Sequence, residues 1–318
     1  MQSKPRVIVI VGPTAVGKTA LSIMAAKELN GEVISGDSMQ IYKGLDIGTA
    51  KVTQEEKQGI PHYLLDELEP GESFTAADFK IKGREAIEKI LTKGKLPIIA
   101  GGTGLYIESL LFDLPLGRKA SSDERVRKAL EEEAAETGKL KMWKKLEMID
   151  PEAAEAIHPN NVRRVIRALE VYQMTGKAFS SQKEEAKESP YDYLIIGLSS
   201  DREVLYQRIN DRVDNMLQEG LLNEAHGLWE HVSSDAQAAK GIGYKELFPY
   251  FDKQQTLEES VEKIKQHSRN YAKRQLTWFR NRLPEIKWFD LLKKGDEKEK
   301  ALQTMKRFLS SSHSRKEE

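Results

Sequence analysis

A buried strand, a glycine-rich loop and a helix follow one another near the N-terminus, and this order constrains the fold most. Residues 6–11 read RVIVIV, a β-branched run typical of a strand buried on both faces of a parallel sheet. Residues 12–19 read GPTAVGKT and match the phosphate-binding pattern G-x-x-x-x-G-K-[ST]. Residues 18–29 then predict a helix that ends at Asn30-Gly31. A chance glycine-rich turn is the alternative, but it would not need a buried strand before it and a helix after it. Because the motif and both neighbouring elements are present, we expect a site for a di- or triphosphate.

The residue types of this loop fit such a ligand. Gly12 and Gly17 allow the backbone to turn so that successive N–H groups face one anion, and the helix N-terminus adds positive potential. Lys18 can neutralise phosphate oxygens, and the Thr19 hydroxyl is placed to ligate Mg²⁺. The motif predicts the ligand class and leaves the reaction open.

Three more strands are predicted at 32–35, 96–100 and 193–198. With the helix expected at 78–92, they alternate in the manner of an α/β sheet with right-handed crossovers. The fold class we expect is therefore α/β, with a parallel sheet core flanked by helices.

Polar or glycine-rich segments follow two of these strands. Asp37 comes after the second, and the segment 101–104, GGTG, comes after the third. Because the carboxyl ends of parallel strands line the ligand crevice, both are expected beside the phosphate loop. Asp37 is a candidate general base or Mg²⁺ partner, with a plain helix N-cap as the alternative. A simple turn is the alternative for the glycine-rich segment.

The segment from about 114 to 189 breaks the alternation. It lacks an apolar β-branched run, is rich in Glu, Lys and Ala, and reads as an inserted helical domain. In its clearest helix, 161–175, apolar side chains share one face and Arg163, Arg164 and Arg167 share the other. A solvated helix face is the alternative to nucleic-acid binding for these arginines.

The domain boundaries follow from these patterns. We expect a core formed by 1–113 and 190–290, a helical insertion at 114–189, and a C-terminal helix with a disordered polar tail at 291–318.

Composition limits the function classes. The 318 residues contain 50 Lys plus Arg and 50 Asp plus Glu, so nucleic-acid binding needs local basic patches. The chain has no Cys, which excludes a thiol nucleophile and a Cys-ligated metal. Because it can form no disulfide either, we expect a cytoplasmic location. No apolar run is long enough to cross a membrane.

One basic patch stands out in this neutral chain. Residues 263–283 hold seven Lys or Arg and no acid, with Tyr271, Trp278 and Phe279 interleaved. Basic side chains track phosphates and aromatic rings stack on bases, although a solvated helix face with buried aromatics is the alternative.

Several strings together resemble a known family. In chain order they are GPTAVGKT, DSMQIYKGLDIGTAK, AGGTGLY, HPNNVRRVIRALEVYQMTGK, KGIGYKE and AKRQLTWFRNR. They are similar to the bacterial tRNA dimethylallyltransferases, the tRNA delta-2-isopentenylpyrophosphate transferase family, from about residue 5 to about residue 290. One departure is Val52, where many members have proline.

The resemblance implies a reaction. Family members transfer a dimethylallyl group from dimethylallyl diphosphate to the exocyclic amine of the adenosine immediately 3′ of the anticodon in tRNA, and they release diphosphate. The loop would then bind the donor's diphosphate with Mg²⁺ rather than ATP. A P-loop-type core with an inserted helical domain, a cytoplasmic monomer and no membrane are implied as well.

The resemblance also implies residue roles. Asp37 would be the general base, Arg212 would assist diphosphate departure, and Thr19 would meet Mg²⁺ and diphosphate. The implied diphosphate-binding residues are Gly12, Pro13, Thr14, Ala15, Val16, Gly17, Lys18 and Thr19. The implied tRNA-binding residues are Asp37, Ser38, Met39, Gln40, Thr103, Arg125, Arg163, Arg164, Val165, Ile166, Arg167, Lys240, Gly241, Ile242, Gly243, Tyr244, Lys245, Lys273, Arg274, Gln275, Trp278 and Arg280.

Three other functions share parts of this pattern. A small-metabolite kinase would have the same sheet and loop, but it predicts an arginine-bearing lid and no long basic C-terminal half. An adenylate isopentenyltransferase would use the same donor with a free nucleotide, which needs neither the insertion nor the basic helix. An RNA-binding ATPase switch would need a water-positioning carboxylate or glutamine, for which we find no separate candidate.

Overall fold

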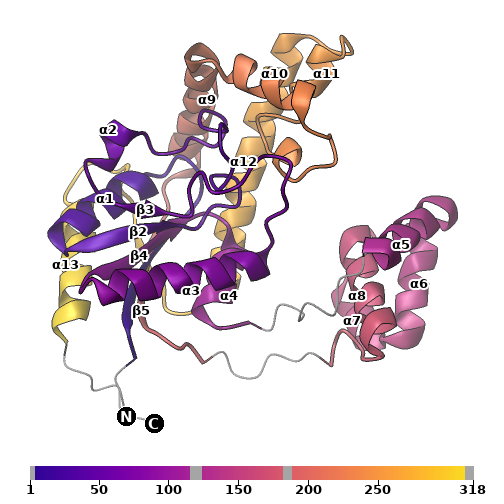
Figure 1. The fold of residues 1–318 in the computed structure, drawn as a ribbon, viewed down its shortest axis with the longest axis horizontal. Helices are drawn as coiled ribbons and strands as arrows, with labels where there is room; N and C mark the ends of the chain where they lie inside the picture. Colours follow the sequence, from indigo (N-terminus) through magenta and orange to yellow (C-terminus); the bar gives the residue numbers. More distant parts are fainter. Residues whose placement is uncertain (1–3, 115–123, 182–187, 312–318) are drawn as a thin grey trace. The chain divides into compact units, whose positions relative to one another are not determined.

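The computed structural model describes residues 4–114, 124–181 and 188–311 (Figure 1). The chain divides into two compact units, described separately below. Unit 1 comprises residues 1–113 and 189–318, and unit 2 comprises residues 114–188.

Unit 1 is built on a six-stranded parallel sheet with the order β3-β2-β4-β1-β5-β6. The central strand β1 is fully buried from Val7 to Val11, and Ile8 lies between Ile98 of β4 and Leu194 of β5. The sheet confirms the predicted α/β fold class. The strands are β1 Arg6–Val11, β2 Gly31–Ser35, β3 His62–Tyr63, β4 Leu96–Gly101, β5 Asp192–Leu198 and β6 Lys287–Phe289.

Helices cover both faces of this sheet. Right-handed crossovers place α1 and α3 on opposite faces, because the chain moves in opposite directions along the sheet after each of them. The helices of unit 1 are α1 Lys18–Glu28, α2 Gln54–Lys57, α3 Ala76–Thr92, α4 Gly104–Leu111, α9 Arg202–Glu219, α10 Leu221–His231, the 3₁₀ turn η2 Ala238–Lys240, α11 Phe248–Phe251, α12 Leu257–Arg282 and α13 Glu297–Ser310.

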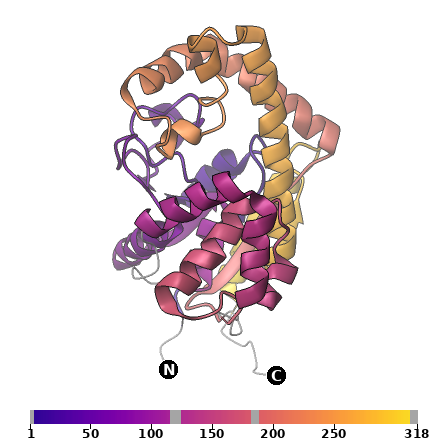
Figure 2. The ribbon, with the colours of Figure 1, turned by 90° about the vertical axis from the view of Figure 1, so that its right-hand side faces the viewer.

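One apolar core joins the sheet to α1, α9, α12 and α13. Figure 2 shows α12, in orange, as a long helix along unit 1. Arg6 of β1 donates hydrogen bonds to the carbonyls of Leu309 and Ser311, so the end of α13 is fixed to the first strand. The disorder expected for the polar tail concerns mainly 312–318, which lie outside the described residues.

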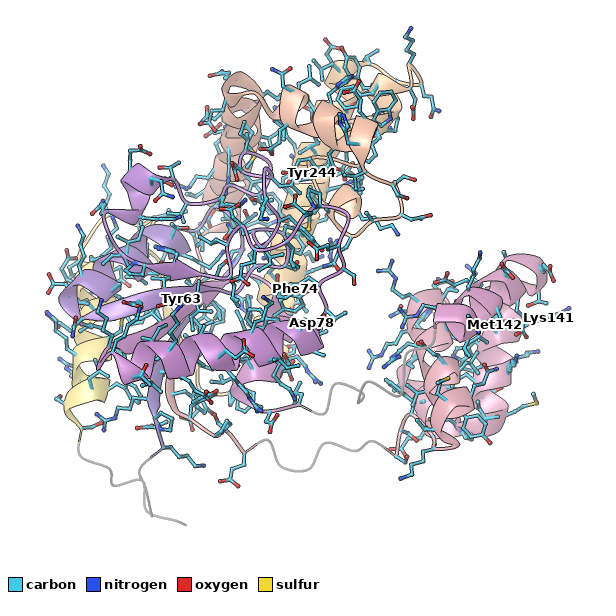
Figure 3. The ribbon with its side chains drawn as sticks, viewed as in Figure 1. Tyr63, Phe74, Asp78, Lys141, Met142 and Tyr244 are labelled. Carbon is cyan, nitrogen blue, oxygen red and sulfur yellow. The ribbon has the colours of Figure 1, made fainter. Side chains whose placement is uncertain are left out.

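Unit 2 consists of α5 Glu124–Thr137, α6 Lys139–Ile149, α7 Pro151–Ala156 and α8 Val162–Thr175. Its own core gathers Leu146, Val165, Ile166 and Leu169 with other apolar side chains. The predicted helix 161–175 is α8, which is capped by the Asn161 side chain and ends at Gly176 with φ 68°. On α6, Met142 is buried and Lys141 is exposed (Figure 3).

No helix in the described ranges is long and apolar enough to cross a membrane.

Candidate active site

The phosphate loop joins β1 to α1 at the carboxyl edge of the sheet. Ala15 has φ 64° and Gly17 has φ 101°, so the backbone turns twice into the left-handed region before the helix begins. Such turns point successive N–H groups toward one anion. Lys18 opens α1, and its Nζ donates to the Pro13 carbonyl at 2.7 Å. The loop therefore has the backbone shape that a phosphate group requires.

The charge of Lys18 depends on its surroundings. Burial lowers the pKa of Lys18 to about 8, while the Asp37 carboxylate opposes this change and Arg212 adds to it. The charges of Asp37 and Arg212 therefore both act on Lys18. A bound anion would favour the charged lysine.

Helix α9 brings two arginines to the loop. Arg212 donates from Nη1 to Thr14 Oγ1 at 3.3 Å, and Arg208 donates from Nε to the Ala15 carbonyl at 3.1 Å. Burial lowers the pKa of Arg212, and the Asp37 charge opposes that shift. Arg212 was predicted and Arg208 was missed, although their i, i+4 spacing places both on one helix face.

Asp37 follows β2 and begins the loop 37–51. Its Oδ1 accepts a hydrogen bond from the Met39 N–H at 2.8 Å, which forms an Asx turn rather than a helix N-cap. Among the residues that the structure describes, Oδ2 receives no hydrogen bond. One carboxylate oxygen thus orients the side chain, and the other remains available for a ligand.

Thr103, after β4, fixes the same loop. Its Oγ1 accepts from the Ser38 N–H at 3.0 Å and donates to Ser38 Oγ at 3.3 Å. Within the loop, Gln40 accepts from Ser35 Oγ at 2.9 Å and donates to the Thr49 carbonyl at 3.2 Å. Thr103 and Gln40 therefore hold the segment that positions Asp37.

Gln275, on α12, bridges the phosphate loop and the glycine-rich segment. Its Oε1 accepts from the Thr14 N–H at 3.0 Å, and its Nε2 donates to the Gly102 carbonyl at 3.0 Å. The side chain is 5% exposed, and a Cβ at position 102 would lie 2.1 Å from Nε2. A larger residue at position 102 would therefore displace the Gln275 amide from its hydrogen bond to the Gly102 carbonyl.

Tyr271 lies one helical turn before Gln275. Burial raises the pKa of the Tyr271 hydroxyl to about 12, and interactions with the Thr103 and Gln275 side chains act in the opposite direction. The Asp37 charge raises this pKa further, which places the phenol in the same site. Tyr271 was noted in the sequence only as one aromatic of a basic helix.

The other predicted tRNA-binding residues of unit 1 differ in exposure. Tyr244 is buried at 1% exposure, and Trp278 is half-buried against Gly104. The Trp278 Nε1 is buried, and no described group accepts its hydrogen. The exposed basic residues are Lys240, Lys245, Lys273, Arg274 and Arg280.

The predicted tRNA-binding residues of unit 2 also divide into two kinds. Arg163 and Arg164 are exposed, as is Arg125 on α5. Arg167 instead donates at 2.9 Å to the buried carboxylate of Glu170. The side chains of Val165 and Ile166, at 0% and 5% exposure, belong to the helical core, so RNA contact there would have to come from their exposed neighbours.

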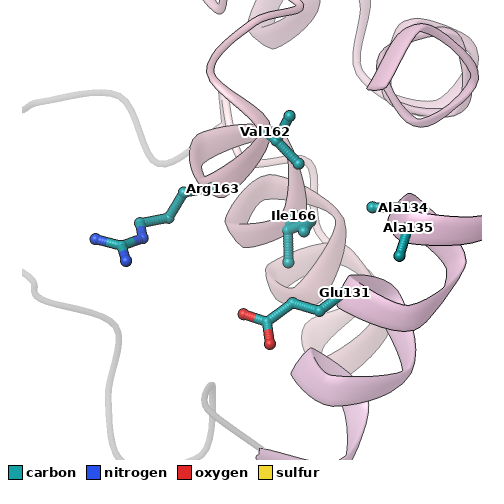
Figure 4. A pocket seen from close by; sticks show the side chains of 6 residues that line it. All are labelled: Glu131, Ala134, Ala135, Val162, Arg163 and Ile166. Carbon is teal, nitrogen blue, oxygen red and sulfur yellow. The ribbon is translucent and has the colours of Figure 1, made fainter. Parts of the chain in front are cut away.

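Unit 2 also has a hollow of about 360 Å³ between α5 and α8. Figure 4 shows Val162 and Ile166 facing α5, and Arg163 also lines the hollow. Its lining is mostly apolar, and its charged members are Glu131 and Arg163.

The described residues contain no cluster of three or more His, Cys, Asp or Glu side chains that could enclose a metal ion. The Thr19 hydroxyl is exposed at the start of α1, and Asp37 has its second oxygen available. These donors fit Mg²⁺ that takes its other ligands from a diphosphate and water.

Comparison with known proteins identifies the family. A model described as IPP transferase matches residues 40–282. The chain belongs to the IPP transferase family. It is 55% identical over 291 residues to a tRNA dimethylallyltransferase of Geobacillus kaustophilus, covering 91% of this chain and 92% of the relative. It is 57% identical over 284 residues to a tRNA dimethylallyltransferase of Enterococcus faecalis, covering 89% of this chain and 91% of that relative.

Solved structures of family members share the fold. The full-length tRNA isopentenylpyrophosphate transferase of Bacillus halodurans matches with a TM-score of 0.73 and 47% identity, over 96% of this chain and 97% of that one. A eukaryotic dimethylallyltransferase acting on tRNA matches with a TM-score of 0.84 and 34% identity, over 98% of this chain and 81% of that one.

Proposed function

We propose that this family member transfers a dimethylallyl group from dimethylallyl diphosphate to the exocyclic amine of the adenosine immediately 3′ of the anticodon in tRNA. The observation that supports it most is the meeting of Lys18, Arg212 and Asp37 at one edge of the sheet. Two cations suit a diphosphate, and one carboxylate suits an amine that must lose a proton.

The donor side rests on the phosphate loop. The diphosphate binds the backbone N–H groups of the loop, Lys18 and Arg212, with Arg208 at the rim. Thr19 would hold Mg²⁺ together with the diphosphate, and the bound ion would add charge stabilisation to the leaving group. An allylic diphosphate ionises readily, so stabilising the departing diphosphate lowers the barrier.

The acceptor side rests on Asp37. The adenine amine is a poor nucleophile because its lone pair is delocalised, so removing its proton during attack helps. We assign that role to Oδ2 of Asp37, since Oδ1 is occupied by the Met39 N–H. The adenine must leave the anticodon-loop stack, which is inexpensive in a single-stranded loop.

We propose tRNA contacts in each of the two units. The contacts in unit 1 are Thr103 and the exposed cations Lys240, Lys245, Lys273, Arg274 and Arg280. The contacts in unit 2 are Arg125, Arg163 and Arg164. The two compact units support a division into a catalytic core at 1–113 with 190–290 and a tRNA-contacting insertion at 114–189. Residues 291–318 would then extend the core. We also propose a cytoplasmic location, because tRNA is the proposed substrate, and a monomer, as the family resemblance implies.

The test is incubation of the chain with labelled dimethylallyl diphosphate and either unmodified tRNA or AMP. We expect Mg²⁺-dependent label transfer to tRNA and none to AMP. Transfer to AMP alone would support an adenylate isopentenyltransferase. No transfer, with hydrolysis of ATP or phosphorylation of a metabolite, would overturn the proposal in favour of a switch or a kinase.

A further inference from the structure

Glu224, on α10, is a carboxylate whose two oxygens accept four hydrogen bonds from two other segments of unit 1. Oε2 accepts from the N–H groups of Asp46 at 2.7 Å and Ile47 at 2.9 Å. Oε1 accepts from the Gly48 N–H at 2.8 Å and from the Tyr244 hydroxyl at 2.7 Å. Three consecutive amides and one phenol therefore depend on a single side chain.

The first of these segments is the loop 37–51, which starts with Asp37. Gln40 donates to the carbonyls of Thr49 and Ala50 at 3.2 and 3.3 Å, so the two ends of the loop are connected. A displacement at 46–48 would be passed through Gln40 to the residues next to Asp37. The position of the proposed base therefore depends on contacts made at the far end of its loop.

The second segment is 240–245, which packs directly on the first. A Cβ at Gly48 would lie 2.6 Å from the ring and hydroxyl of Tyr244, so glycine is required there by that close approach. A Cβ at Gly241 would lie 2.6 Å from Cε of Met39. The two segments thus touch both near Asp37 and at Gly48, and the Glu224 carboxylate joins them at the second point.

We propose that Glu224 is a positioning residue for the tRNA acceptor. By fixing loop 37–51 against segment 240–245, it places Asp37 to face the adenine amine and gives the RNA a preformed surface. This inference rests on the proposed function. The donor side has separate supports, since Lys18 contacts Pro13 and Gln275 contacts Thr14, and we therefore expect donor binding to be independent of Glu224.

The test uses Glu224→Gln. Glutamine keeps the length but replaces one acceptor oxygen with an NH₂ group, so at least one of the three backbone N–H groups loses its acceptor. Hydrogen bonds to a charged group are strong enough that kcat/KM for tRNA should fall on the order of ten- to a hundredfold. KM for dimethylallyl diphosphate should stay within about twofold of the wild-type value, because the donor contacts are intact.

Glu230→Gln is the matched control. Glu230 lies on the same helix, is exposed and pairs with His226 at 3.3 Å, so its substitution should leave both kinetic constants unchanged. Amide hydrogen exchange gives the direct readout: the N–H groups of residues 46–48 should exchange faster in Glu224→Gln and not in Glu230→Gln. A role in general stability alone would instead weaken donor and tRNA kinetics equally.

Tyr244→Phe provides a milder second variant, because it removes one hydrogen bond and keeps the buried ring. It should weaken kcat/KM for tRNA in the same direction, and less than additively with Glu224→Gln. A wild-type kcat/KM for tRNA in Glu224→Gln would overturn the inference. If the wild-type chain itself transfers no label to tRNA, the proposed function fails first, so the two failures are distinguishable.

Discussion

The Thr14 N–H, inside the phosphate loop, donates to Oε1 of Gln275 at 3.0 Å. One amide of the loop is therefore used to attach it to α12 rather than to face an anion. The same glutamine donates to the Gly102 carbonyl, so the loops that follow β1 and β4 share one buried support.

The two hydrogen bonds of Gln275 should contribute to stability and to donor binding. Gln275→Met keeps the volume but leaves the Thr14 N–H and the Gly102 carbonyl without partners, and each unsatisfied buried group costs about 1–3 kcal/mol. The free energy of unfolding, measured with urea, should fall by about 2 kcal/mol or more, and kcat/KM for the donor should fall as well. The control is Gln266→Met on the exposed face of α12. Equal behaviour of the two variants would show that the bridge does not matter.

The second prediction concerns pH. The pKa of Lys18 is lowered to about 8, so the lysine is charged below pH 8 and loses its charge above it. Because a diphosphate binds the charged form, kcat/KM for the donor should be level well below pH 8, bend near pH 8 and fall about tenfold per pH unit well above it. Lys18→Arg stays protonated throughout and should lose this alkaline limb, whatever its absolute rate. An unchanged limb in that variant would assign the titration to another group.

The third prediction separates the base from the turn at Asp37. Asn can accept the Met39 N–H as Asp does, so Asp37→Asn preserves the Asx turn while it removes the negative charge and the ability to take a proton. Single-turnover rates should fall about 10²–10⁴-fold while donor and tRNA affinities change little. The rate should not recover as Mg²⁺ is raised. Full rescue by Mg²⁺ would make Asp37 a metal partner instead.

The fourth prediction concerns unit 2. Reversing Arg163 and Arg164 to Glu should raise the KM for tRNA and reduce the salt dependence of binding by about one unit of slope per lost phosphate contact. The matched control reverses Lys141 and Lys144, which are also exposed in this unit. If both pairs change tRNA binding alike, only net charge matters.

Arg167 is left intact in that experiment. Its ion pair with buried Glu170 means that a reversed charge would place two carboxylates together, and the resulting loss of stability would be mistaken for loss of binding.

The sequence predicted the elements whose signals are local. The run at 6–11, the loop at 12–19 and the helix at 161–175 appear close to their predicted bounds, because strand propensity, glycine placement and helix caps lie in neighbouring residues. The edge strands β3 and β6, of two and three residues, were missed because such short segments have no periodicity.

The contacts that shape the candidate site come from residues far apart in the chain. Gln275 and Thr14 are 261 positions apart, and Glu224 and Gly48 are 176 apart. No spacing rule connects such pairs, so a polar side chain on a basic helix and a glutamate on a surface helix looked ordinary in the sequence. Only the folded chain shows that they position the loops.

The proposed reaction transfers a dimethylallyl group to an adenosine amine beside the anticodon. The direct measurement supplies dimethylallyl diphosphate and an unmodified tRNA anticodon stem-loop that carries, immediately 3′ of the anticodon, either adenosine or purine riboside, which lacks the exocyclic amine. After digestion, mass spectrometry of the nucleosides should find one dimethylallyl group on that adenosine and none on the purine riboside. Modification of both stem-loops, or of neither, would contradict the account.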